Sequence, residues 1–107
     1  MTEKQQKTML LHAFFKQVWD DRENDQGICY CASTGKELKG THYRSLTTCF
    51  HHMYPKNKYP ELAMDENNIV ILHPDVHTEV EHDEDKHPKI KKLKEKYGRT
   101  IETGIYE

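Results

Sequence analysis

Apolar residues near the N-terminus follow the spacing of one helix face. They recur as adjacent pairs four positions apart, and an α-helix of about 3.6 residues per turn brings such positions to one side. The pairs are formed by Leu10, Leu11, Phe14, Phe15, Val18 and Trp19. The pattern predicts an amphipathic helix up to about Asp20, with its apolar stripe in the core. A polar run follows, and Gly27 fits the end of this segment.

The next segment predicts a β-hairpin. Residues 28–31 form a short β-prone run, and the turn-forming residues 33–36 lead the chain back into Glu37-Leu38. From residue 39 to residue 47 the pattern is weak and predicts no regular element.

Two further strands are expected on either side of a long loop. Residues 48–50 lead into the adjacent histidines His51 and His52, which we place at the end of the strand because neighbouring strand residues point to opposite faces. Residues 68–72 give the strongest strand pattern, since the run is short, β-branched and bounded by polar residues. The connection over residues 53–67 contains two prolines, and long loops of this kind are often functional.

Prolines mark the starts of two helices in the C-terminal part. Pro74 lacks an N–H that would be unpaired in a first turn anyway, which predicts a helix from about Pro74 to His82. Pro88 repeats this signal, and the helix that follows has one apolar seam, which Gly98 closes. The seam consists of Ile90, Leu93 and Tyr97.

The order of these elements predicts an α+β fold. The chain of 107 residues has room for one domain. Because 35% of the residues are hydrophobic and 32% are charged, we expect a modest core and a thin margin of stability. A bound metal ion would help to hold such a fold together.

Charge is divided between two neighbouring blocks. The net charge of −2 does not by itself favour a nucleic-acid partner. An acidic block without Lys or Arg lies directly before a basic block, which a phosphate backbone could engage. The acidic block is Glu61, Asp65, Glu66, Asp75, Glu79, Glu81, Asp83, Glu84 and Asp85, and the basic block is Lys86, Lys89, Lys91, Lys92, Lys94, Lys96 and Arg99.

Neither a leader peptide nor a membrane span is visible in the sequence. The N-terminus lacks a charged and apolar leader, and no apolar run approaches the roughly 20 residues that span a bilayer. We therefore expect a soluble, cytoplasmic protein without membrane contact. The three cysteines, Cys29, Cys31 and Cys49, are an odd number, which favours reduced thiols over a disulfide framework.

Three segments carry a motif. The run Phe-His-His-Met-Tyr-Pro-Lys spans residues 50–56, Asn-Asn-Ile-Val-Ile-Leu spans residues 67–72, and His77 follows. This set resembles the signature of HNH (ββα-metal) endonucleases, and the match covers about residues 28–82. The resemblance implies a single nuclease domain over residues 1–107, with a ββα-metal core flanked by N-terminal and C-terminal helices. It also implies a divalent cofactor (Mg²⁺, Mn²⁺ or Zn²⁺) and the cleavage or nicking of DNA.

The resemblance also assigns roles to individual residues. His51 matches a metal-ligand position, His52 the general base and His77 the second metal ligand. Asn68 matches the middle Asn, which coordinates the metal in some relatives and holds the base by hydrogen bonds in others. Glu81, one helical turn after His77, matches the position of a further ligand.

The chemistry of phosphodiester hydrolysis explains this choice of residue types. The reaction needs an activated water and stabilisation of the charge on the phosphoryl and leaving oxygens. A histidine with an ordinary pKa of about 6.5 can accept the proton from water near neutral pH, and another neutral imidazole can bind a divalent cation.

Other residues extend this picture. Lys56 and Lys58 follow the histidine pair closely and are expected to contact phosphate, and Arg44 is a further candidate. A zinc knuckle from the three cysteines and His42 is an alternative to buried thiols, although Cys29 and Cys31 lie closer together in sequence than zinc-binding pairs usually do.

Two other functions stay open at this point. The chain could be a non-catalytic zinc-binding or nucleic-acid-binding domain, which predicts metal binding that involves the cysteines and no turnover. It could also be a protein-interaction module, an accessory to a larger phage or bacterial machine. In that case neutralising Glu79, Asp83 and Asp85 would abolish partner binding.

Overall fold

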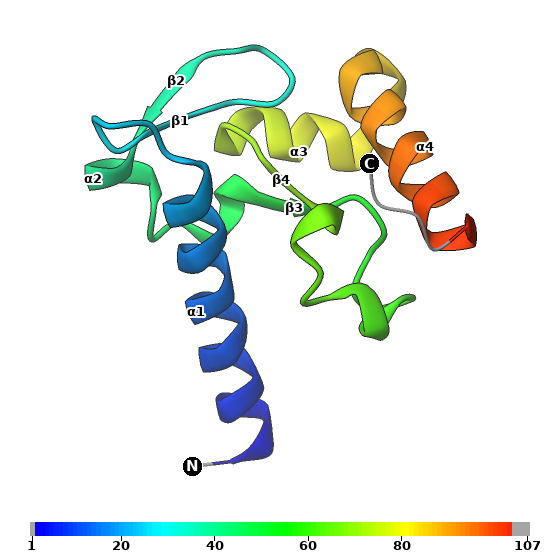
Figure 1. The fold of residues 1–107 in the computed structure, drawn as a ribbon, viewed down its shortest axis with the longest axis horizontal. Helices are drawn as coiled ribbons and strands as arrows, with labels where there is room; N and C mark the ends of the chain where they lie inside the picture. The colour runs from blue at the N-terminus through cyan, green and yellow to red at the C-terminus, as the bar shows by residue number, and fades with distance from the viewer. Residues whose placement is uncertain (1, 104–107) are drawn as a thin grey trace.

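The computed structural model describes residues 2–103 and has an α+β architecture (Figure 1). The predicted α+β class is therefore confirmed. The helices are α1 (Glu3–Arg22), α2 (Gly40–Tyr43), α3 (Pro74–His82) and α4 (Pro88–Thr103), and the strands are β1 (Ile28–Tyr30), β2 (Glu37–Lys39), β3 (Phe50–His52) and β4 (Ile69–Ile71).

Two antiparallel strand pairs form the sheets. In the predicted hairpin, β1 pairs with β2 so that Cys29 lies opposite Leu38. In the second pair, β3 and β4 place His51 opposite Val70. The chain runs from β4 through two residues into α3, so β3, β4 and α3 follow each other as strand, strand and helix.

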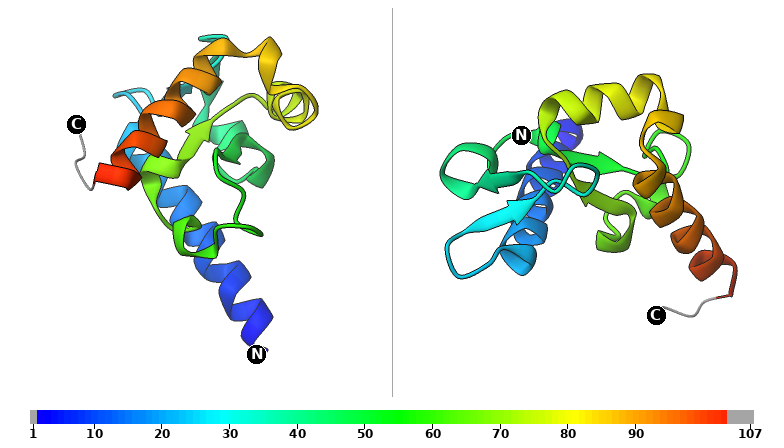
Figure 2. Two further views of the ribbon diagram at one scale, coloured as in Figure 1. Left: turned by 90° about the vertical axis from the view of Figure 1, so that its right-hand side faces the viewer. Right: turned by 90° about the horizontal axis from the view of Figure 1, so that it is seen from above.

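The core joins the C-terminal part of α1 to the strands and to α3 and α4. Phe15, Val18 and Trp19 are buried, as predicted, but Leu10 is 63% exposed, so the expected apolar stripe is wrong for the first half of the helix. Figures 1 and 2 show that the N-terminal end of α1 projects beyond the other elements, although Leu11 still packs against the core.

Gly98 does not end the last helix as expected, because α4 continues to Thr103. A Cβ atom at Gly98 would lie 2.5 Å from the hydroxyl oxygen of Tyr54. The glycine therefore makes room for the Tyr54 side chain inside a continuous helix.

Short helices occur where the sequence predicted none. The weak segment after β2 contains α2, and the loop between β3 and β4 contains 3₁₀ turns at Pro60–Leu62 and Glu66–Asn68. Asn68 thus ends a turn and does not open the strand, and the predicted strand over residues 48–50 instead begins at Phe50. The turns bring the loop back to β3, so that the carbonyl of Ala63 lies beside the ring of His52. None of the helices within residues 2–103 has the length and apolar character needed to cross a membrane.

Candidate active site

The two adjacent histidines at the end of β3 have different neighbours. His51 is 8% exposed, and its ring lies edge-on to the ring of His77 on α3, with centroids 5.1 Å apart. The ring of His52 lies 5.7 Å from that of Phe15 on α1. Because successive strand residues point to opposite faces, the strand directs His51 toward α3 and His52 toward α1.

Three potential metal ligands converge between β3 and α3. His51, His77 and Glu81 each offer one ligand atom, and these atoms lie within 4.8 Å of one another. Two ligands of one cation, each about 2.1 Å from it, are separated by about 3 to 4 Å, so a small movement of these side chains would let them share a divalent ion. Among residues 2–103 it is the only such group of His, Cys, Asp or Glu side chains.

A backbone carbonyl fixes the orientation of His77. Its Nδ1 lies 2.6 Å from the carbonyl oxygen of Thr48, which can only accept, so Nδ1 carries the proton. The other ring nitrogen, Nε2, lies 3.0 Å from Glu81 Oε1. Two electron-rich atoms face each other at this distance only around a cation, which is either a proton or a metal ion.

His51 supplies a second indication of a ligand. Its Nε2 is buried and has no hydrogen-bond partner, although buried polar atoms are nearly always paired. Burial lowers the pKa of His51 to about 4, and the charges of His77, His52 and Lys94 add to this effect. A neutral, unpaired and buried imidazole nitrogen is suited to bind a metal ion.

His52 has one nitrogen engaged and one available as a base. Its Nε2 donates to the carbonyl oxygen of Ala63 at 2.9 Å, so the lone pair is on Nδ1. Burial lowers the pKa of His52, the hydrogen bond to Ala63 raises it, and the charges of Lys56 and His77 lower it. The net shift is downward, which keeps the ring neutral near pH 7.

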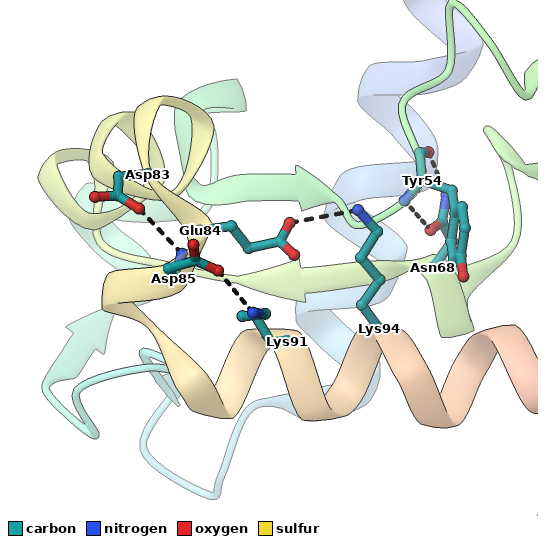
Figure 3. Close-up of polar contacts among 7 residues, drawn as sticks. All are labelled: Tyr54, Asn68, Asp83, Glu84, Asp85, Lys91 and Lys94. Carbon is teal, nitrogen blue, oxygen red and sulfur yellow. Dashed lines mark hydrogen bonds and ion pairs between the residues drawn. The ribbon is translucent and has the colours of Figure 1, made fainter.

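Asn68 is fully buried and clamps the loop that follows β3. Its Oδ1 accepts from the backbone N–H of Tyr54 at 2.8 Å, as Figure 3 shows. Its Nδ2 donates to the carbonyl oxygens of Tyr54 and Leu62 at 3.0 and 3.2 Å. Since Leu62 precedes Ala63, Asn68 positions the loop that orients His52. Of the two roles that stayed open for this residue, the contacts match the holding role.

The side chains of His51, His52, His77 and Glu81 line one cleft, which has a volume of about 640 Å³, whereas Asn68 does not line it. Lys56 lines it beside the histidines, and His12 lines it from α1. The cleft therefore combines the possible metal ligands, the possible base and cationic side chains on a surface that a polyanion can reach.

Known proteins add nothing to this description. Comparison of the chain with protein-family models, curated proteins and solved structures finds no match. What the site can do follows from its own geometry.

The structure does not bring every predicted contact residue to the cleft. Arg44 donates from Nε and Nη2 to the carboxylate of Asp20 at 2.8 Å each, and this hydrogen-bonded pair lowers the pKa of Asp20. Neither Arg44 nor Lys58 is among the residues that line the cleft. Of the three predicted phosphate contacts, only Lys56 lies beside the histidines.

The cysteines lie apart from the ligand cluster. Cys29, Cys31 and Cys49 are buried as free thiols, and within the described residues they do not form a metal-binding group with His42. Burial raises the pKa of Cys29 and of Cys49 to about 11. Since zinc binds the thiolate, these two positions do not favour a zinc knuckle.

Sequence reasoning missed the groups that orient the site. The carbonyls of Thr48 and Ala63 hold His77 and His52, and no residue-type pattern reveals a backbone acceptor. Lys94 also lines the cleft. It lies four residues after Ile90, so the helical repeat could have placed it on the inward face of the last helix.

Proposed function

We propose that this protein is a divalent-metal-dependent endonuclease that hydrolyses or nicks phosphodiester bonds in DNA, with a ββα-metal site of the HNH kind. The observation that carries the proposal is the presence of a three-residue ligand cluster and a histidine with a free basic nitrogen in one cleft. The strand, strand and helix order of β3, β4 and α3 supports it.

The ligand cluster sets the choice of metal. His51, His77 and Glu81 would hold the ion, and two imidazoles with one carboxylate accept Mn²⁺ or Zn²⁺ readily, whereas Mg²⁺ prefers oxygen ligands. When bound, the ion supplies stabilisation of negative charge on the phosphoryl oxygens and on the leaving oxygen.

His52 acts as the general base. Its Nδ1 accepts a proton from a water molecule, whose oxygen forms a bond to phosphorus while the bond from phosphorus to the 3′ oxygen breaks. The leaving oxygen takes a proton from solvent. The bond from His52 Nε2 to Ala63 keeps the ring oriented and stabilises the positive charge that it gains.

The test is a nicking assay on supercoiled plasmid with Mg²⁺, Mn²⁺ or Zn²⁺ and a chelator control. His52→Ala and His52→Gln should reduce the rate by about 10²- to 10⁴-fold, the range typical of a general base. His82→Ala, an exposed histidine on the same helix as His77, should keep the wild-type rate. Wild-type protein that leaves plasmid, linear duplex, branched DNA and RNA intact in every metal would overturn the proposal.

A further inference from the structure

One lysine of α4 differs from its neighbours in where its side chain lies. Lys94 lines the same cleft as His51, His77 and Glu81, and its side chain is 32% exposed. It comes one turn after the fully buried Ile90 and one turn before the buried Tyr97, so it lies on the face of α4 that packs inward.

The present partners of Lys94 hold it weakly. Its Nζ lies 3.4 Å from Glu84 Oε2 and 5.4 Å from the ring centroid of Tyr54. Charge-assisted hydrogen bonds between nitrogen and oxygen are usually about 2.7–2.9 Å long, so the contact with Glu84 leaves the ammonium group able to engage a better acceptor.

Lys91, one turn earlier on α4, provides the contrast. Its Nζ lies 2.6 Å from Asp85 Oδ1, and Lys91 does not line the cleft. Figure 3 shows the two pairs: Lys91 turns to Asp85, whereas the ammonium group of Lys94 lies between Glu84 and Tyr54.

We propose that Lys94 binds a non-bridging oxygen of the phosphodiester in the cleft and exchanges Glu84 for the phosphate when a polynucleotide enters. This inference rests on the proposed function, because it places the phosphate beside the ligand cluster. Glu84 holds the ammonium group at 3.4 Å and gives way to the phosphate, whose oxygen can approach the ammonium group to the usual shorter distance.

Lys94 supplies positive charge to the cleft from α4, which lies outside the strand and helix that carry the motif. The carboxylates of Glu81 and Glu84 also line the cleft and repel phosphate, and a cation on α4 offsets this repulsion.

The test compares Lys94→Ala, Lys94→Arg, Glu84→Gln and the matched control Lys91→Ala. Binding of a fluorescein-labelled DNA duplex is measured by anisotropy with a chelator present, and cleavage of the same duplex is measured with Mn²⁺. Circular dichroism and thermal unfolding establish that each variant is folded.

Lys94→Ala should weaken binding by about 10- to 100-fold, as expected for the loss of a hydrogen bond between charged groups. Lys94→Arg should restore most of the binding. Lys91→Ala should change it by less than about 3-fold, the general effect of one surface charge. Glu84→Gln should tighten binding, because it removes the competing carboxylate.

The two proposals fail in different ways. If the wild type binds and cleaves the duplex but Lys94→Ala behaves like Lys91→Ala in both assays, the role of Lys94 is refuted and the nuclease proposal stands. If the wild type binds without cleaving in any metal and Lys94→Ala alone weakens binding, the nuclease proposal fails and the phosphate site stands. A wild type that neither binds nor cleaves overturns both.

Discussion

Replacing Asn68 by Asp changes the hydrogen-bonding of the loop clamp while preserving its shape. The carboxylate keeps the acceptor that faces the Tyr54 N–H at 2.8 Å. It also puts a second oxygen where Nδ2 now donates to the carbonyls of Tyr54 and Leu62 at 3.0 and 3.2 Å. Since Asn68 is fully buried, water cannot replace the lost donors.

The magnitude follows from these contacts. Two buried carbonyls that lose their donor cost about 1 to 3 kcal/mol each, and a buried carboxylate that faces them adds a desolvation penalty. We expect Asn68→Asp to lower the free energy of unfolding by about 3 to 5 kcal/mol at pH 7. This is a large part of the roughly 5 to 15 kcal/mol that stabilises a domain.

The loss should depend on pH, with a sign that the same geometry fixes. The two carbonyls favour the protonated acid, so the pKa of the introduced Asp is raised in the folded state above its unfolded value of about 3.9. The free energy of unfolding of the variant is therefore closest to that of wild type below about pH 4, and it decreases as the pH rises through the pKa of the folded state.

Urea unfolding between pH 4 and pH 8 measures this difference. Asn67→Asp changes the exposed neighbouring residue and should lie within about 0.5 kcal/mol of wild type. Asn68→Ala should be destabilised without the additional pH dependence. The reasoning is refuted if Asn68→Asp is as stable as Asn67→Asp at pH 7, or if its loss is the same at every pH.

Three further predictions test other parts of the molecule. Burial lowers the pKa of His51 in the folded state to about 4, below its ordinary value of 6.5. The free energy of unfolding of the metal-free wild type should therefore fall by up to about 3 kcal/mol as the pH falls from about 6.5 to 4. If urea unfolding gives the same pH profile for wild type and His51→Gln, this prediction is wrong. Zn²⁺ or Mn²⁺ at about 100 times its Kd should stabilise the protein by about 2.7 kcal/mol, measured as a rise in Tm. His77→Gln and Glu81→Gln should lose this rise in Tm, whereas His82→Gln should keep it. If both His77→Gln and Glu81→Gln keep the full rise, the assignment of the metal ligands is wrong. Arg22 donates to the carbonyls of Ile69 and Glu66 at 2.7 and 2.6 Å, so Arg22→Ala should cost about 2 kcal/mol, and Arg44→Ala, which breaks an exposed pair, should cost clearly less in the same unfolding experiment.

The sequence allows the elements to be predicted because local patterns carry their signals. The β-branched run at Ile69–Ile71 and the proline at the start of α3 act within a few residues, and both elements form where expected. The apolar face of α1 was also recognised, but a periodic pattern does not reveal what covers that face. Leu10 belongs to this pattern, yet it is 63% exposed.

The sequence predicts which side chains form the candidate site, but not the loop that orients them. His51, His77 and Glu81 meet as expected, since pairing of β3 with β4 and the helical repeat of α3 place them. The loop geometry could not be predicted, because it depends on backbone carbonyls and on contacts between distant segments. Gly98 shows the same limitation: its local signal is a helix end, but it lies within α4, where a larger residue would collide with Tyr54.

The hydrogen bonds behind the histidines explain how neighbouring rings of the same type can do different work. The Thr48 carbonyl accepts a hydrogen bond from Nδ1 of His77 and leaves Nε2 for a ligand. The Ala63 carbonyl accepts a hydrogen bond from Nε2 of His52 and leaves Nδ1 as a base. The acceptor at Ala63 depends on the adjacent Leu62 carbonyl, which Asn68 holds. Loss of that clamp should therefore disturb the orientation of His52 more than the ligand cluster, which belongs to β3 and α3. Within the proposed nuclease, Asn68→Ala should lower kcat with little change in KM while metal binding persists, a pattern that separates the positioning of the base from the binding of the metal.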